Sequence, residues 1–368
     1  MEQAQTQTQT QTQEKKLTAK DYVFLVSQGV SNTVLVFLGI GLLVNTVGTT
    51  IHWDALVQVG NIAQKLLAPA LGMAIAVMMR TSTLVIGGTM IASTVGANSV
   101  YFTSGAVANT MTATGWQAAQ DAGSQIMTAG QPVSAVLAGI IAAMLGKWMT
   151  GKTPLDMVLV PFSVTMVGSI AGLGLASVTT PALNWVSGAL GHTMQVNPVL
   201  GALVVSFAWF VFLMTPASSA ALAIAVQLDP MSSGAALIGT TVAFVSFTAM
   251  SYNQNTIGGN IAQGLVTPKV QFANLLKRPV LAIGPAAIAM ITAVIAVVGF
   301  DFKVPYALAG LGLNSLIAPL WLAAHDMRGL MLLIVFGVVI PGVLSWTYYR
   351  FLKVIGQTRL QDLRLQEV

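Results

Sequence analysis

Charged side chains are too sparse in this sequence to solvate the surface of a globular protein in water. Asp, Glu, Lys and Arg make up 7% of the 368 residues, whereas 55% are hydrophobic and the mean hydropathy is +0.77. Soluble chains carry about 25% charged residues. Inside a bilayer, where this solvation is not needed, long apolar runs satisfy their backbone by forming helices. The sequence therefore predicts an all-α polytopic membrane protein.

Apolar runs recur at about the 20-residue length that crosses the hydrocarbon of a bilayer. They occupy residues 22–46, 56–79, 82–101, 132–147, 157–177, 198–215, 233–251, 279–300 and 329–349. Three weaker segments, at 178–192, 214–230 and 304–324, contain proline, which removes a helical hydrogen bond. We expect broken or re-entrant helices there. The prediction is about ten transmembrane helices plus re-entrant or broken hairpins.

Basic residues flank the apolar region at both ends. By the positive-inside rule, lysines at 15, 16 and 20 and a basic C-terminal stretch place both termini in the cytoplasm of a cell membrane. Residues 102–131 hold no Lys or Arg, which suits an external loop. The expected organisation is a disordered Gln/Thr-rich tail (1–20), a transmembrane scaffold (21–177), a substrate-binding part with broken helices (178–349) and a cytoplasmic tail (350–368).

One polar segment, residues 251–279, interrupts the apolar sequence. Its side-chain amides both donate and accept hydrogen bonds, and a Gly-Gly pair lets the backbone approach a ligand closely. Neutral amides suit a solute with many hydroxyl groups. The same composition also fits a cytoplasmic loop that is polar because it is solvated. We call the weaker segments at 178–192 and 214–230 the 180 element and the 215 element. The candidate substrate-binding residues, in the polar segment and in these two elements, are Asn253, Gln254, Asn255, Gly258, Gly259, Asn260, Gln263, Thr180, Asn184, Thr215, Ser218 and Ser219.

The run S-Y-x-x-N-x-x-G-G-x-x-A-Q-G at 251–264, with Asn274, Lys277–Pro279 and TPASSAALAIA at 215–225, resembles a known family. It is similar to the membrane (IIC) component of the sugar phosphotransferase system, and more narrowly to its stand-alone type-2, toxin-regulator-like branch, over about residues 18–350. The resemblance implies a homodimer whose N-terminal part dimerises and whose C-terminal part moves like an elevator. The family often has a basic and then an acidic residue where Asn253 and Gln254 stand.

The residues of a catalytic or metal site are not evident in the sequence. The chain has no cysteine, and its three histidines lie far apart. We therefore expect no enzyme activity, no metal and no cofactor, and any phosphorylation of a substrate would require separate IIA and IIB proteins. Without a basic stripe bearing aromatic residues, nucleic acid is not an expected partner. Asp229 is the one candidate for ion coupling, although a helix terminus is the favoured interpretation.

Two hypotheses for function follow from these patterns. The first is a carrier for a small, neutral, sugar-like solute, bound where polar residues coincide with broken helices. The alternative is a membrane-embedded sensor or regulator that binds a solute without net transport. A channel is disfavoured because the sequence shows no charged ring and no filter-like repeat.

Overall fold

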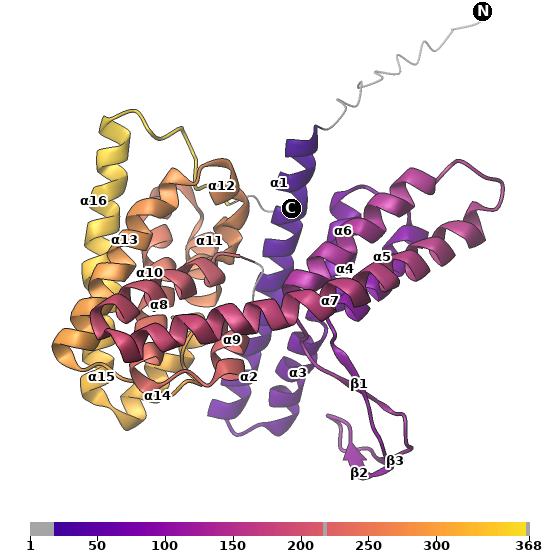
Figure 1. Ribbon diagram of the computed structural model, residues 1–368, viewed down its shortest axis with the longest axis horizontal. Helices are drawn as coiled ribbons and strands as arrows, with labels where there is room; N and C mark the ends of the chain where they lie inside the picture. The colour runs from indigo at the N-terminus through magenta and orange to yellow at the C-terminus, as the bar shows by residue number, and fades with distance from the viewer. Residues whose placement is uncertain (1–17, 216–218, 366–368) are drawn as a thin grey trace, which may run out of the picture.

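The computed structural model describes residues 18–215 and 219–365, and helices dominate both halves of it (Figure 1). In the N-terminal half, a bend of 50° separates two of these helices at Leu66. The elements of this half are α1 (Ala19–Thr33), the π-helical η1 (Val34–Ile40), α2 (Gly41–Thr50), α3 (Asp54–Lys65), α4 (Leu67–Met78), α5 (Thr83–Gly96) and α6 (Pro132–Met149). Because α1, η1 and α2 are continuous, they form one long helix that begins inside the tail expected at residues 1–20. Residues 1–17 of that tail lie outside the described residues.

Between α5 and α6 the chain forms two small antiparallel ribbons. β1 (Val100–Phe102) pairs with β4 (Gln125–Met127), and β2 (Val107–Met111) pairs with β3 (Gln117–Gln120). The ribbons project from the helices at one end of the molecule (Figure 1). The charge-poor stretch at 102–131 is thus a folded projection, whereas the sequence predicted only a loop.

The helix α7 (Asp156–Val196) is the main departure from the sequence prediction. Its 41 residues include Pro161 and Pro181, so the break expected at 178–192 is wrong. Pro181 cannot donate to the Ser177 carbonyl, and the hydroxyl groups of Ser177 and Thr179 donate to the carbonyls of Gly174 and Leu175 instead. At about 1.5 Å per residue, α7 extends roughly 60 Å, about twice the hydrocarbon thickness of a bilayer. It therefore links the two halves of the molecule instead of forming a single perpendicular span.

The C-terminal half is built around α10, which is 83% buried over its most apolar stretch. The breaks expected at 214–230 and 304–324 are confirmed. The segment 214–230 contains only a short helix, and the segment 304–324 is non-helical up to residue 313. Apart from the polar segment, the elements of this half are α8 (Pro198–Leu213), α9 (Ser219–Val226), α10 (Pro230–Ser251), α13 (Val280–Val294), η5 (Ile295–Gly299), η6 (Asn314–Leu316), α14 (Ile317–His325), α15 (Met327–Leu332), η7 (Leu333–Val339) and α16 (Ile340–Val354).

Helix length and composition confirm the polytopic α-helical class. Among the described residues, six helices are long and apolar enough to cross a membrane, or seven when the bent pair α3 and α4 counts as one span. Two shorter apolar helices, α5 and α8, add to these. We expected about ten crossings, which is more than these helices provide. Part of the difference comes from α7, a single helix that covers two segments predicted separately, 157–177 and 178–192.

Buried apolar side chains form separate clusters in the two halves. The largest extends from Met194 to Leu363 around α10, and two others lie between Val26 and Val164. The division that we placed between residues 177 and 178 falls inside α7, and the assignment of a scaffold part and a substrate part stays a prediction.

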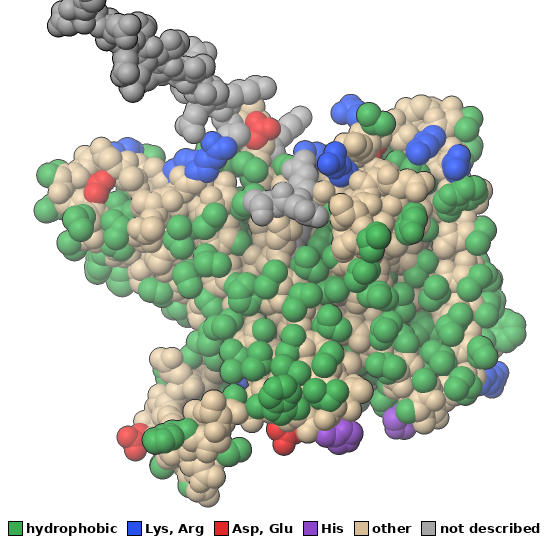
Figure 2. Space-filling view, turned by 180° about the vertical axis from the view of Figure 1, so that it is seen from behind, with side chains coloured by type: hydrophobic (Ala, Val, Ile, Leu, Met, Phe, Trp, Pro, Cys, Tyr) green, Lys and Arg blue, Asp and Glu red, His purple; other side chains and the backbone are tan. Residues whose placement is uncertain are grey.

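Charged side chains gather at the ends of the helices. Figure 2 shows a row of Lys and Arg along one edge of the molecule, and His together with a further basic side chain toward the opposite edge. We call the edge that carries the row of Lys and Arg, among them Lys147, the basic edge. There the Lys147 ammonium donates to the Tyr22 hydroxyl (2.8 Å) and the Met79 carbonyl (2.7 Å), so it joins the ends of three helices. α1 begins and α16 ends there (Figure 1).

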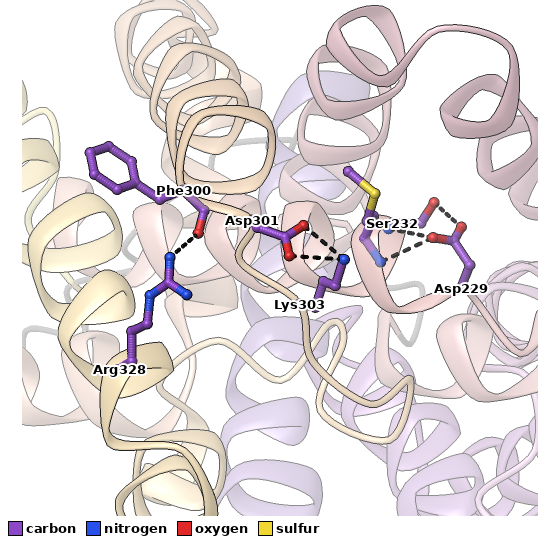
Figure 3. A network of polar contacts seen from close by, with 7 residues as sticks. Asp229, Ser232, Phe300, Asp301, Lys303 and Arg328 are labelled. Carbon is purple, nitrogen blue, oxygen red and sulfur yellow. Dashed lines mark hydrogen bonds and ion pairs between the residues drawn. The ribbon is translucent and has the colours of Figure 1, made fainter.

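A second group of polar contacts lies where α10 begins and α13–η5 ends (Figure 3). The Asp229 carboxylate caps α10 by accepting from the backbone of Met231 and Ser232, both at 3.0 Å. Asp301 pairs with Lys303 at 2.8 Å, and the Arg328 guanidinium donates to the Phe300 carbonyl. The interpretation of Asp229 as a helix terminus is confirmed, because an N-cap is the place that its contacts give it.

Candidate functional site

The polar segment folds into a hairpin of short helical turns, and we call residues 251–279 the polar hairpin. The Thr256 hydroxyl caps α11 by accepting from the Gly259 backbone (3.1 Å), and Thr267 begins the next turn before Pro268. Its final helix lies beside α1. Its elements are η2 (Tyr252–Gln254), α11 (Ile257–Ile261), η3 (Ala262–Val266), η4 (Pro268–Gln271) and α12 (Phe272–Lys277).

A chain of amide side chains fixes the interior of the polar hairpin. Gln263 donates to Asn260 (3.0 Å) and to the Ser251 hydroxyl (2.8 Å), and it accepts from Gln271 (2.8 Å). Asn274 continues the chain by donating to Gln271 (2.8 Å). Gln263 and Gln271 are fully buried. Because a satisfied buried network is rigid, these two glutamines position the outer amides and do not face a solute in this state.

Three cavities formed by described residues adjoin the polar hairpin. The first, which we call the α1 cavity, has a volume of about 1070 Å³ and separates α1 from the hairpin. Gln28 and Asn32 line it from α1, facing Asn253, Asn255 and Thr256. The remaining lining residues of the polar hairpin and the C-terminal tail are Gln254, Gly258, Gly259, Ala262, Val270, Ala273, Asn274, Gln361, Arg364 and Leu365.

The sequence analysis missed Gln28 and Asn32. They are four residues apart, so they share one face of α1, and they lie within the apolar run at 22–46. A polar pair at helical spacing inside a span is a signal of function, because polar groups within a membrane are costly. We did not use this signal.

The second cavity, of about 1220 Å³, opens between the end of α10, α11 and α16. Its wall is largely apolar and aromatic, with Tyr252 and Trp346 among its residues, and it shares Asn253 and Asn255 with the α1 cavity. Asn260 also lines it. The predicted amides at 253–260 thus stand between two cavities.

The third cavity, of about 750 Å³, is basic. Lys277 and Arg278 line it from α12, and Arg359 and Arg364 from the C-terminal tail. Burial lowers the pKa of Lys277, and the charge of Asp21 opposes that shift. The Lys277 ammonium also lies 3.0 Å from the centre of the Phe24 ring.

The 215 element lies apart from these cavities but is tied to the polar hairpin through Lys269. The Lys269 ammonium is buried and donates to the carbonyls of Phe212 (3.3 Å) and Thr215. Burial lowers the pKa of Lys269 to about 7. The Ser219 hydroxyl donates to the Gly310 carbonyl (2.8 Å), which links this element to the non-helical part of the segment 304–324. Ser218 lies outside the described residues.

Thr180 and Asn184 lie on α7, away from the amides of the polar hairpin. Asn184 is exposed, and neither residue lines the three cavities above. The Thr180 hydroxyl is buried without a hydrogen-bond partner in the structure. The structure therefore brings together the candidates at 253–263 and separates them from those at 180 and 184.

The comparisons with known proteins give one match. The profile of the family described as "Phosphotransferase system, EIIC" matches residues 24–365. No curated protein and no solved structure matches the chain. The matched range includes α1, the polar hairpin and the C-terminal tail, which together enclose the α1 cavity.

Proposed function

This chain belongs to the EIIC family of the phosphotransferase system, whose members are membrane permease components for sugars, and from that premise we propose that it carries a small neutral sugar-like solute. The proposed binding site is the α1 cavity. Its amides and hydroxyl groups can each donate to or accept from a sugar hydroxyl.

The chemistry of the cavity wall carries this proposal. Gln28, Asn32, Asn253, Asn255 and Thr256 present neutral polar groups from two sides of the α1 cavity. Among the described residues that line it, Arg364 alone is charged. A neutral wall of this kind suits hydroxyl groups better than it suits a carboxylate or an ammonium group, which would need a charge opposite to its own.

The position of the α1 cavity supports an elevator-type movement. α1 packs with the N-terminal apolar cluster, whereas the polar hairpin contributes Leu275 to the cluster around α10 and contacts α1 through α12. A solute held between two separately packed bodies can change its exposure when one body moves against the other. Two contacts at Gly39 of η1 would guide the movement. Val266 of the polar hairpin packs against this glycine, and the Ser315 hydroxyl donates to the Gly39 carbonyl (3.4 Å).

The remaining features of the proposal come from the family and from the charge pattern. The chain would act as a homodimer, with both termini on the cytoplasmic side where the basic edge lies. Separate IIA and IIB proteins would supply the phosphoryl group if the solute is phosphorylated. The chain itself would bind and move the solute without covalent chemistry.

A binding experiment on purified protein in detergent tests the site. We expect one or more neutral sugars or polyols to raise its unfolding temperature, by the linkage between binding and stability. Replacing Asn32 with alanine should weaken that affinity roughly tenfold, since one hydrogen bond contributes about 1 kcal/mol or slightly more. Asn61→Ala, which removes an exposed amide outside the cavities, is the matched control.

Two results would count against the proposal. If only anions stabilise the protein, the neutral site is wrong. If a sugar binds with the same affinity to the Asn32→Ala variant, the solute lies outside the α1 cavity. Net uptake into proteoliposomes then separates a carrier from a sensor, because a sensor binds the solute without accumulating it.

A further inference from the structure

The chain folds back on itself after its last helix. Gly356, with φ +71°, ends α16 in a left-handed turn that glycine adopts without strain. The following residues cross the basic edge toward the polar hairpin, and the Arg278 guanidinium donates to the Gln357 carbonyl on the way. We call residues 357–365 the tail segment.

The amides of the polar hairpin hold the tail segment by its backbone. Leu363 donates its backbone N–H to Gln254 (3.0 Å), and its carbonyl accepts from Asn255 (3.1 Å) and Gln271 (2.9 Å). Asn255 also accepts from the backbone N–H of Leu365 (2.7 Å). One asparagine side chain therefore pairs with the tail backbone as a neighbouring strand would.

Two further contacts complete the attachment. Asn274 donates to the Arg364 carbonyl (3.1 Å), and the Leu363 side chain is fully buried in the apolar cluster around α10. The attachment thus consists of five hydrogen bonds from four amides and one apolar anchor. Because these bonds go to backbone groups, any residue could make them, and Leu363 supplies the side-chain specificity.

The attachment uses groups that the proposed solute site needs. Asn255 and Asn274 line the α1 cavity, and so do Gln361, Arg364 and Leu365 of the tail segment. A Cβ atom added at Gly259 would lie 3.4 Å from the Leu365 side chain, so the tail covers this glycine. Gly258, the next residue, has no tail atom within 4 Å of such a Cβ.

We propose that the tail segment is a latch that closes the α1 cavity at the basic edge and competes with the solute for Asn255 and Asn274. The inference rests on the proposed function, since a latch regulates a site only where a solute binds. With the tail docked, the amides are satisfied by peptide groups and the tail forms part of the cavity wall. With the tail released, the same donors and acceptors are free to meet hydroxyl groups.

The tail segment is built to release without unfolding the helices. It is short, Leu360 is 95% exposed, and Gln361 holds a left-handed conformation at φ +62°. Segments with few buried side chains open locally at a free energy well below that of global unfolding. Leu363 is the one tail side chain buried in a core, so undocking requires the exposure of a single leucine.

Thiol labelling tests the latch directly, because the chain contains no native cysteine. Gly259→Cys places a thiol under the tail, and Gly258→Cys places one beside it as the matched control. In detergent-solubilised full-length protein, we expect a maleimide to react at position 259 roughly tenfold more slowly than at position 258, which corresponds to about 1.4 kcal/mol of protection. Removal of residues 359–368 should raise the rate at 259 to that at 258.

Leu363→Asp is a second way to release the tail while the full chain is kept, and it should also speed labelling at 259. Equal rates at 258 and 259 in the full-length protein would overturn the latch, even if both release variants failed to fold. So would a rate at 259 that neither release variant changes.

Labelling involves no solute, so it can succeed when the proposed function fails. If a sugar binds as proposed, truncation should also increase its affinity, and an unchanged affinity would overturn the competition.

Discussion

Lys269 shows how a single buried charge can join two broken elements. Its ammonium donates to the carbonyl of Phe212, in the last turn of α8, and to that of Thr215, just beyond the helix. It belongs to the polar hairpin, so the contact fixes the hairpin against the 215 element. Hydropathy treats each lysine as a surface charge, so the sequence does not reveal this role of Lys269.

The lowered pKa of Lys269 predicts a pH dependence of stability. Its pKa is about 7 in the folded protein and 10.5 in the reference state. Between these values the unfolded chain binds more protons, so the free energy of unfolding should rise as the pH increases from 7 toward 10. The measurement is the unfolding temperature in detergent at several pH values.

The Lys269→Met variant is the control for this effect. It removes the titrating group, so the rise with pH should flatten. It also leaves the carbonyls of Phe212 and Thr215 without this donor, which should lower the stability by about 1–3 kcal/mol at high pH, where the wild-type amine is uncharged. An undiminished pH dependence in the variant would show that another group causes it.

At the scale of elements, small residues set how closely α7 packs on α5. A Cβ atom added at Gly172 would lie 2.9 Å from the Gly96 Cα atom, closer than such atoms approach. Close approach through small residues is the usual basis of helix packing in membranes. The long α7 is thus positioned by its glycines, whereas its exposed apolar face suits lipid.

This packing predicts opposite outcomes for two substitutions on the same helix. Gly172→Leu should push α5 and α7 apart and destabilise the protein by about 1–3 kcal/mol, the usual cost of overpacking. Gly174→Leu, where an added Cβ meets no atom within 4 Å, should change stability little. Thermal unfolding of the two variants checks this, and equal losses at both sites would show that the close packing of Gly172 on α5 does not determine the stability.

For the whole molecule, the placement of charge predicts the orientation in the membrane. The polar hairpin adjoins the basic cavity, whereas Trp116, between β2 and β3, is 77% exposed in the stretch 102–131, which holds no Lys or Arg. If the basic edge is cytoplasmic, a thiol at 116 and one at 258 should face opposite sides of the membrane.

Labelling of sealed vesicles tests this orientation. An impermeant maleimide added to right-side-out vesicles should react with Trp116→Cys and spare Gly258→Cys, and inverted vesicles should give the reverse. Reaction of both variants from the same side would refute the proposed topology.

The sequence by itself determined the membrane class, the breaks at 214–230 and 304–324, and the position of the polar hairpin. Each depends on local composition: a lack of charge, a proline in a weak apolar run, or several amides in one short stretch. Even there, local reasoning failed at Pro181, because α7 continues through this proline although the proline removes one helical hydrogen bond.

Only the tertiary structure decided which polar groups meet. Asn255 lies more than 100 residues before Leu363, and Gln28 lies on a helix that precedes the polar hairpin by more than 200 residues. A hydrogen bond depends on the distance and angle between two atoms, and hydropathy along a chain carries neither. The α1 cavity and the latch over it therefore exist only once α1, the polar hairpin and the tail segment have packed together.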